Sequence, residues 1–100
     1  DWVIHERARL EQAYTAALES LARLYLNVNQ LEKCISICQL GLTLNPCNET
    51  LYQLSMRANA VLGDRASIAR LYQACKAALG DELGLAPSLE TETLFHELTM

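Results

Sequence analysis

Four cysteines and two histidines are the side chains in this sequence best suited to bind a metal or to act as nucleophiles. Cys34 and Cys38 are one helical turn apart, and in principle they could ligate a metal with other members of the group. The short C-x-x-C spacing of many zinc sites is absent, and a free cysteine usually behaves as a small buried apolar side chain. We therefore expect the cysteines to be free thiols in a reducing cytosol, with no metal and no other cofactor. The remaining members of the group are Cys47, Cys75, His5 and His96.

A catalytic site is not indicated by the other reactive residues. His5 and His96 lie near opposite ends of the chain, and neither a glycine-rich phosphate loop nor a nucleophile elbow is present. Glu90 and Glu92 fall where a helix would begin, and a helix dipole favours acidic side chains there without any chemistry. We predict that the chain is not an enzyme and has no catalytic residues.

The composition is typical of one packed, all-α domain. The 100 residues are 51% hydrophobic with only four glycines and two prolines, and β-branched residues never alternate as in a strand. Eight basic and twelve acidic side chains give a net charge of −4, and no segment collects cations. Direct binding to DNA is therefore disfavoured. No apolar run approaches the roughly 20 residues that span a bilayer, so we expect a soluble, cytoplasmic segment without membrane contact.

Capping residues divide the chain into helices. The first helix is predicted from about Trp2 to Asn27, where apolar residues recur every three or four positions. Asn29, with Glu32 as its capping-box partner, is predicted to begin a second helix, which ends near Leu44 before Asn45-Pro46.

Capping residues also divide the second half of the chain into helices. Asn48 is predicted to cap a third helix that closes at Gly63, and Asp64 to cap a fourth that stops at Gly80. Ser88, with Pro87 before it, is predicted to begin a fifth helix. We expect the side chains of Leu83 and Leu85 to tuck under the preceding turn and to help dock this last helix.

An internal period of 34 residues relates the two halves of the chain. A helix-turn-helix unit of this length, with large, small and aromatic signature positions, is the tetratricopeptide pattern. We predict a right-handed stack of helical hairpins of about five helices, with repeats at about 15–48 and 49–82 and a capping helix at about 88–99. The eight signature positions of the first repeat are Leu18, Leu21, Ala22, Tyr25, Cys34, Cys38, Gly41 and Pro46.

Several strings of the sequence resemble the bacterial transcriptional activator domain of SARP-type regulators. The most specific are GDRA at 63–66 and LYQACKAALGDELGLAPSLET at 71–91, and the resemblance covers nearly the whole chain. It implies a tetratricopeptide-like activation and interaction module that follows a winged-helix DNA-binding domain. We expect residues 1–100 to be a fragment of this helical domain, with DNA bound only through the winged-helix domain, which this chain lacks.

The repeat pattern also predicts a groove lined by the first helix of each repeat. Arg23 and Arg57 are 34 residues apart and should occupy equivalent places, where two guanidinium groups could hold an acidic segment of a protein partner. RNA polymerase or another regulator domain is the expected partner. The alternative is that Arg23 merely pairs with Glu19 in solvent. The predicted partner-binding residues are Glu19, Arg23, Asn27, Gln53 and Arg57.

The sequence leaves two further functions open. Trp2, Val3 and Ile4 would form an exposed apolar patch at the start of the first helix, and such a patch favours a homodimer. The chain would then be an oligomerisation element. A general tetratricopeptide scaffold is the other alternative.

Overall fold

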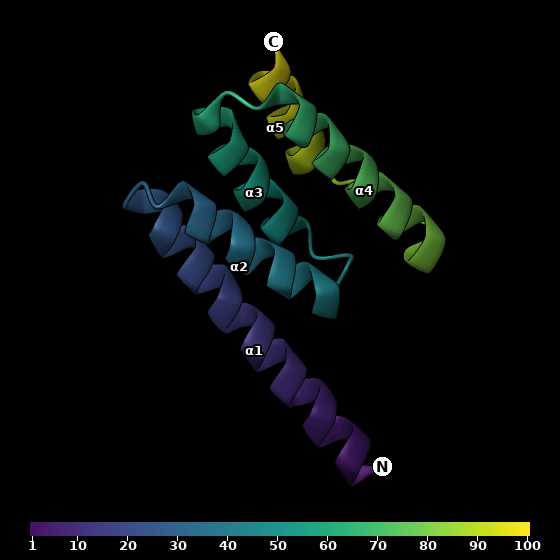
Figure 1. The fold of residues 1–100 in the computed structure, drawn as a ribbon. Coiled ribbons are helices and arrows are strands. Elements are labelled where there is room, and N and C mark those ends of the chain that lie inside the picture. Colours follow the sequence, from purple (N-terminus) through teal and green to yellow (C-terminus); the bar gives the residue numbers. More distant parts are fainter.

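The computed structural model describes residues 1–100 as five helices without strands, which confirms the all-α prediction. Figure 1 shows two antiparallel hairpins, α1 with α2 and α3 with α4, followed by α5, which returns along α3 and α4. The first half of α1 extends beyond the other helices (Figure 1). The helices are α1 (Trp2–Asn27), α2 (Leu31–Leu44), α3 (Glu49–Leu62), α4 (Arg65–Leu83) and α5 (Leu89–Thr99).

The turns inside the two hairpins have the same geometry. Asn29 (φ 63°) and Gly63 (φ 76°) both adopt the left-handed conformation. In each turn the next residue donates its N–H back across the helix end: Gln30 to the Tyr25 carbonyl at 2.8 Å, and Asp64 to the Asn59 carbonyl at 2.9 Å. These are Schellman motifs, which satisfy the last carbonyl groups of a helix.

The predicted capping role of Asn29 is therefore wrong. Its side chain does not cap α2, which begins after Gln30 without any side-chain capping bond, so Glu32 has no capping-box partner. Asparagine tolerates the left-handed region better than other non-glycine residues, and Asn29 instead ends α1. Asn29 and Gly63 thus both end the first helix of their hairpin, at equivalent positions.

The other three predicted N-caps are confirmed. Asn48 accepts a hydrogen bond from the Leu51 N–H at 3.1 Å, and Asp64 accepts one from the Ser67 N–H at 3.0 Å. Ser88 caps α5 by accepting from the backbone N–H three residues later at 3.3 Å. These short polar side chains satisfy N–H groups that have no partner within the helix.

The end of α4 differs from the prediction. Gly80 lies inside the helix, which continues for one more turn to Leu83 and ends at Gly84 (φ 64°). Proline excludes helix from the residue before it, whereas glycine only weakens a helix, so Gly80 does not act as Pro46 does in the first repeat. The side chains of Leu83 and Leu85 are each 57% exposed, so their predicted burial under the turn is also wrong.

The core consists of two apolar clusters on either side of α3. The predicted burial of Cys34, Cys38 and Cys75 is confirmed, since none of the three has any exposed surface. Gly41 permits the close approach of α2 and α3, because a Cβ atom there would overlap the side chain of Leu51. One cluster contains Ala22, Cys34, Cys38, Leu51, Leu54 and Ala58, and the other contains Tyr52, Met56, Ile68, Cys75, Leu79 and Leu94.

None of the five helices combines the length and the apolar character that a membrane span requires. The longest, α1, carries charged side chains along its first half.

Candidate partner-binding surface

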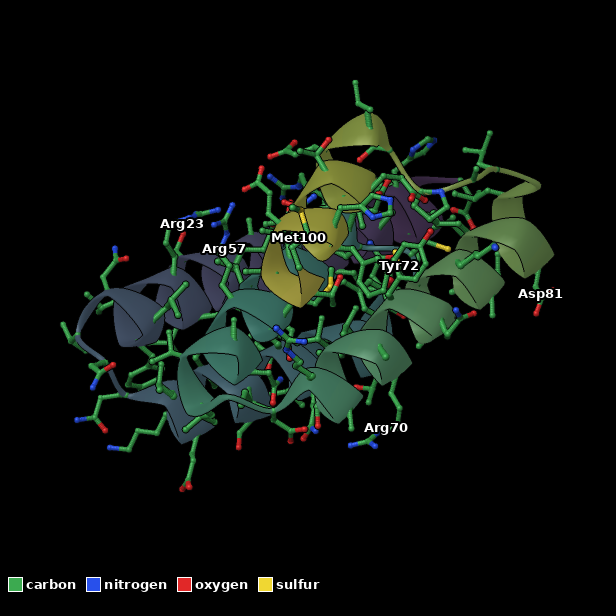
Figure 2. All side chains as sticks on the ribbon, turned by 90° about the horizontal axis from the view of Figure 1, so that it is seen from above. Arg23, Arg57, Arg70, Tyr72, Asp81 and Met100 are labelled. Atoms are coloured by element: carbon green, nitrogen blue, oxygen red, sulfur yellow. The ribbon has the colours of Figure 1, made fainter.

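The first helices of the two hairpins, α1 and α3, contact one another along the stack. Arg23 on α1 and Arg57 on α3 are both exposed, and Figure 2 shows their side chains on the same side of the molecule. The 34-residue period therefore brings the two guanidinium groups to equivalent positions on one face.

Neither arginine has an ion-pair partner. The one salt bridge of the structure joins Arg9 to Glu6 at 2.7 Å, on the part of α1 that extends beyond the other helices. Glu19, one turn before Arg23, makes no ion pair with it. The guanidinium groups of Arg23 and Arg57 thus keep their hydrogen-bond donors free for another molecule.

The other three predicted residues have different surroundings. Asn27 is exposed at the end of α1. Glu19 is half-buried and, together with Asn48, lines a hollow in the surface. Gln53 donates from its side-chain amide to the hydroxyl of Thr91 at 2.9 Å, so it holds α5.

A hollow of about 370 Å³ adjoins Arg57 between α3 and α5. Glu90 and Glu97 of α5 line it with Leu89 and Thr93. Helix α5 thus borders the arginine surface and contributes two carboxylates to its edge, which would disfavour acidic partner groups at that edge.

The docking of α5 depends on a carboxylate that the sequence reasoning did not single out for this role. Glu49, the first residue of α3, accepts hydrogen bonds from the Ser88 N–H at 2.9 Å and from the Thr91 hydroxyl at 2.7 Å. Partial burial acts to raise the pKa of Glu49, but the bonds from Thr91 and Ser88 together outweigh it and hold the pKa below its usual value. The carboxylate therefore clamps the start of α5 to the start of α3.

A second set of contacts joins α5 to α4. The Tyr72 hydroxyl donates to a Glu92 carboxylate oxygen at 2.5 Å, and the rings of Tyr72 and Phe95 stack with centroids 4.0 Å apart. The bond to Glu92 raises the pKa of Tyr72, with smaller contributions from burial and the carboxylate charge. Together with the Glu49 clamp, these contacts fix the helix that borders the arginine surface.

The thiols and imidazoles are not arranged for metal binding. No group of three or more histidine, cysteine or acidic side chains could hold a metal ion, and His5 and His96 are exposed. Burial raises the pKa of Cys34 and Cys38, and that of Cys75 to about 11. Cys47 donates to Glu82 at 3.1 Å, and this bond raises its pKa. All four thiols stay protonated at neutral pH, and a protonated thiol is a poor ligand and nucleophile.

An apolar hollow of about 400 Å³ lies along the extended part of α1. Trp2 and Val3 of the predicted patch line this hollow, whereas Ile4 is exposed but does not line it. Its apolar side chains are Trp2, Val3, Leu10, Tyr14 and Leu44, and each of them is exposed.

A family model described as the bacterial transcriptional activator domain matches residues 1–99. No curated protein and no solved structure matches the chain.

Proposed function

The chain belongs to the bacterial transcriptional activator domain family, a non-catalytic, tetratricopeptide-like domain of transcriptional regulators, and on that premise we propose that it is a protein-interaction module of such a regulator. Its partner is the transcription machinery, through RNA polymerase, or another regulator domain. In this proposal the partner binds the face that carries Arg23 and Arg57, and a separate winged-helix domain binds DNA.

One observation carries the proposal. Arg23 and Arg57 are exposed on the same side of the molecule, on the first helices of the stack, and neither has an ion-pair partner (Figure 2). Guanidinium groups bind carboxylates through paired hydrogen bonds, and two on one rigid face favour an acidic segment of a protein. The chain as a whole carries a net charge of −4, so a general electrostatic attraction would not draw an acidic segment to it, and the two arginines support a specific contact instead.

The test replaces both arginines by alanine. Binding of the purified protein to RNA polymerase, and to the DNA-binding domain of the same regulator, is measured by biolayer interferometry. We expect the R23A/R57A variant to bind at least about tenfold more weakly, because charge-assisted hydrogen bonds are lost. The matched control is K33A/K76A, which removes two exposed charges from the second helices of the hairpins. Unchanged binding by R23A/R57A, with a native circular dichroism spectrum, would refute the proposal.

A second candidate function is homodimerisation through the apolar hollow on α1. Exposed apolar side chains that cluster in this way favour association. Sedimentation velocity at increasing concentration tests it, with Leu10→Glu as the disrupting change and Leu62→Glu, at an exposed position of α3, as the control. The dimer hypothesis fails if the protein stays monomeric, or if both variants dissociate equally.

A further inference from the structure

A polar cleft lies on the face opposite the arginine surface. It has a volume of about 310 Å³ and opens between α2 and α4, which make no direct backbone contact, so that α3 forms its floor. Figure 2 shows Arg70, one of its residues, on the far side of the molecule from Arg23 and Arg57. The cleft is lined by Ile35, Gln39, Ser55, Asn59, Ser67, Arg70, Leu71 and Ala74.

The cleft exists because the second repeat lacks two large side chains. Ser55 and Asn59 lie 34 residues after Leu21 and Tyr25, which are signature positions of the first repeat. Serine and asparagine are much smaller than leucine and tyrosine, and both lie at the floor of the cleft, 1% and 5% exposed. Two small polar side chains thus occupy positions where the repeat pattern has large apolar or aromatic ones. The space that the larger side chains would fill forms the cleft.

These two buried residues have unused hydrogen-bonding atoms. The Asn59 amide donates to the Ser55 carbonyl at 2.8 Å, but no protein group donates to the Asn59 side-chain oxygen, and the Ser55 hydroxyl has no protein partner. Buried polar groups are almost always hydrogen-bonded. No side-chain nitrogen or oxygen without a partner is completely enclosed in this structure, so both atoms keep some access to solvent, and both residues line the cleft. The floor therefore presents the Asn59 oxygen as an acceptor for a ligand N–H group, and the Ser55 hydroxyl as a donor and an acceptor.

The rim and walls define the rest of the ligand. Arg70 donates to the Ser67 hydroxyl at 2.8 Å, and that hydroxyl in turn donates to the Asp64 carboxylate at 2.7 Å. Arg70 makes no direct ion pair, so its remaining N–H groups are free to bind an anion. No acidic residue lines the cleft. Ile35 and Leu71 provide apolar walls. An anion at the rim, an N–H at the floor and a small apolar group between the walls describe an acylated amino acid.

We propose that this cleft binds a small carboxylic acid of the N-acyl amino-acid type. The carboxylate pairs with Arg70, the amide N–H donates to the Asn59 side-chain oxygen, and the branched side chain contacts Ile35 and Leu71. The site lies on another face from the proposed partner surface and does not depend on it. A regulator with such a site would respond to a metabolite through its helical domain.

The probe for the test is N-acetyl-L-leucine, titrated into the isotope-labelled protein and followed by two-dimensional NMR. We expect saturable shifts of the amide signals around the cleft with millimolar affinity, as is usual for a ligand of this size. N-acetyl-L-leucinamide lacks the carboxylate and 4-methylpentanoate lacks the N–H. Both should bind at least about tenfold more weakly, because each loses one anchoring hydrogen bond.

Two variants locate the site. Arg70→Gln should weaken N-acetyl-L-leucine binding about tenfold, and Ser55→Leu, which restores the large residue of the first repeat, should abolish it by filling the floor. Lys76→Gln, an exposed position of α4 outside the cleft, is the charge-matched control and should bind as the unmodified protein does. Absence of saturable shifts, or equal binding by Arg70→Gln and the unmodified protein, would overturn the proposal. Arg70→Gln alters only a surface position, so this outcome can be read even if Ser55→Leu does not fold.

Discussion

The hydroxyl of Thr91 is predicted to contribute measurably to the stability of the domain. Thr91 has no exposed surface, donates to the Glu49 carboxylate at 2.7 Å and accepts from Gln53 at 2.9 Å. Thr91→Val removes the hydroxyl with little change of shape, and the Ser88 cap remains because it uses the backbone N–H. A buried hydrogen bond to a charged group contributes about 1.5–3 kcal/mol, and the partial exposure of Glu49 places the expected loss near the lower end, at about 2 kcal/mol.

Urea unfolding followed by circular dichroism measures this loss. For a domain of this size, a loss of about 2 kcal/mol corresponds to a melting temperature lower by about 10 °C. Thr93→Val on the exposed side of the same helix is the matched control, and it should change stability by less than about 0.5 kcal/mol. Two results would refute the clamp: Thr91→Val as stable as the unmodified protein, or Thr93→Val equally destabilised. A double-mutant cycle with Glu49→Gln should give a coupling energy of about 1 kcal/mol or more.

Three further predictions concern stability. Gly80→Ala should stabilise the protein by about 0.5–1 kcal/mol, because Gly80 is helical with free space around it. Gly41→Ala should instead destabilise it by about 1–3 kcal/mol, because the added methyl group would overlap the side chain of Leu51. Chemical denaturation of the two variants measures both changes. Asn29→Gly should raise the melting temperature and Asn29→Ala should lower it, because the position has a positive φ. The pKa of Glu49 is lowered in the folded state, so its contribution to the free energy of unfolding is complete above its unfolded pKa of about 4.3 and is lost as pH falls below that value. As pH falls through this range, the stability of Glu49→Gln should therefore decline less steeply than that of the unmodified protein.

Much of the candidate site followed from the period of the sequence. The 34-residue spacing of Arg23 and Arg57 was sufficient to expect them on one face, because equivalent positions of stacked hairpins face the same way. The absence of an ion pair between Arg23 and Glu19 was not predictable in the same way. One-turn pairs of this kind are weak, and the neighbouring structure decides whether they form.

The role of Glu49 and the polar cleft had weaker signals in the sequence. The Glu49–Thr91 bond joins residues 42 positions apart, and no local pattern connects them. Ser55 and Asn59 did carry a signal, since they break the large-residue pattern of the first repeat. A polar residue at a core position usually marks either a packing defect or a site, and the neighbouring helices decide between them.

By itself, the sequence determined the five helices, three of their caps and the family of the chain, because those features depend on side chains within a few residues of one another. Asn29 could not be assigned in this way. An asparagine at a helix boundary can cap the start of one helix or adopt the left-handed conformation that ends another, and the backbone conformation of the turn decides which of the two roles it has. The same holds for the length of α4, the docking of α5 and the open floor at Ser55 and Asn59. These were decided by contacts between helices far apart in sequence, which form only when the whole stack is packed.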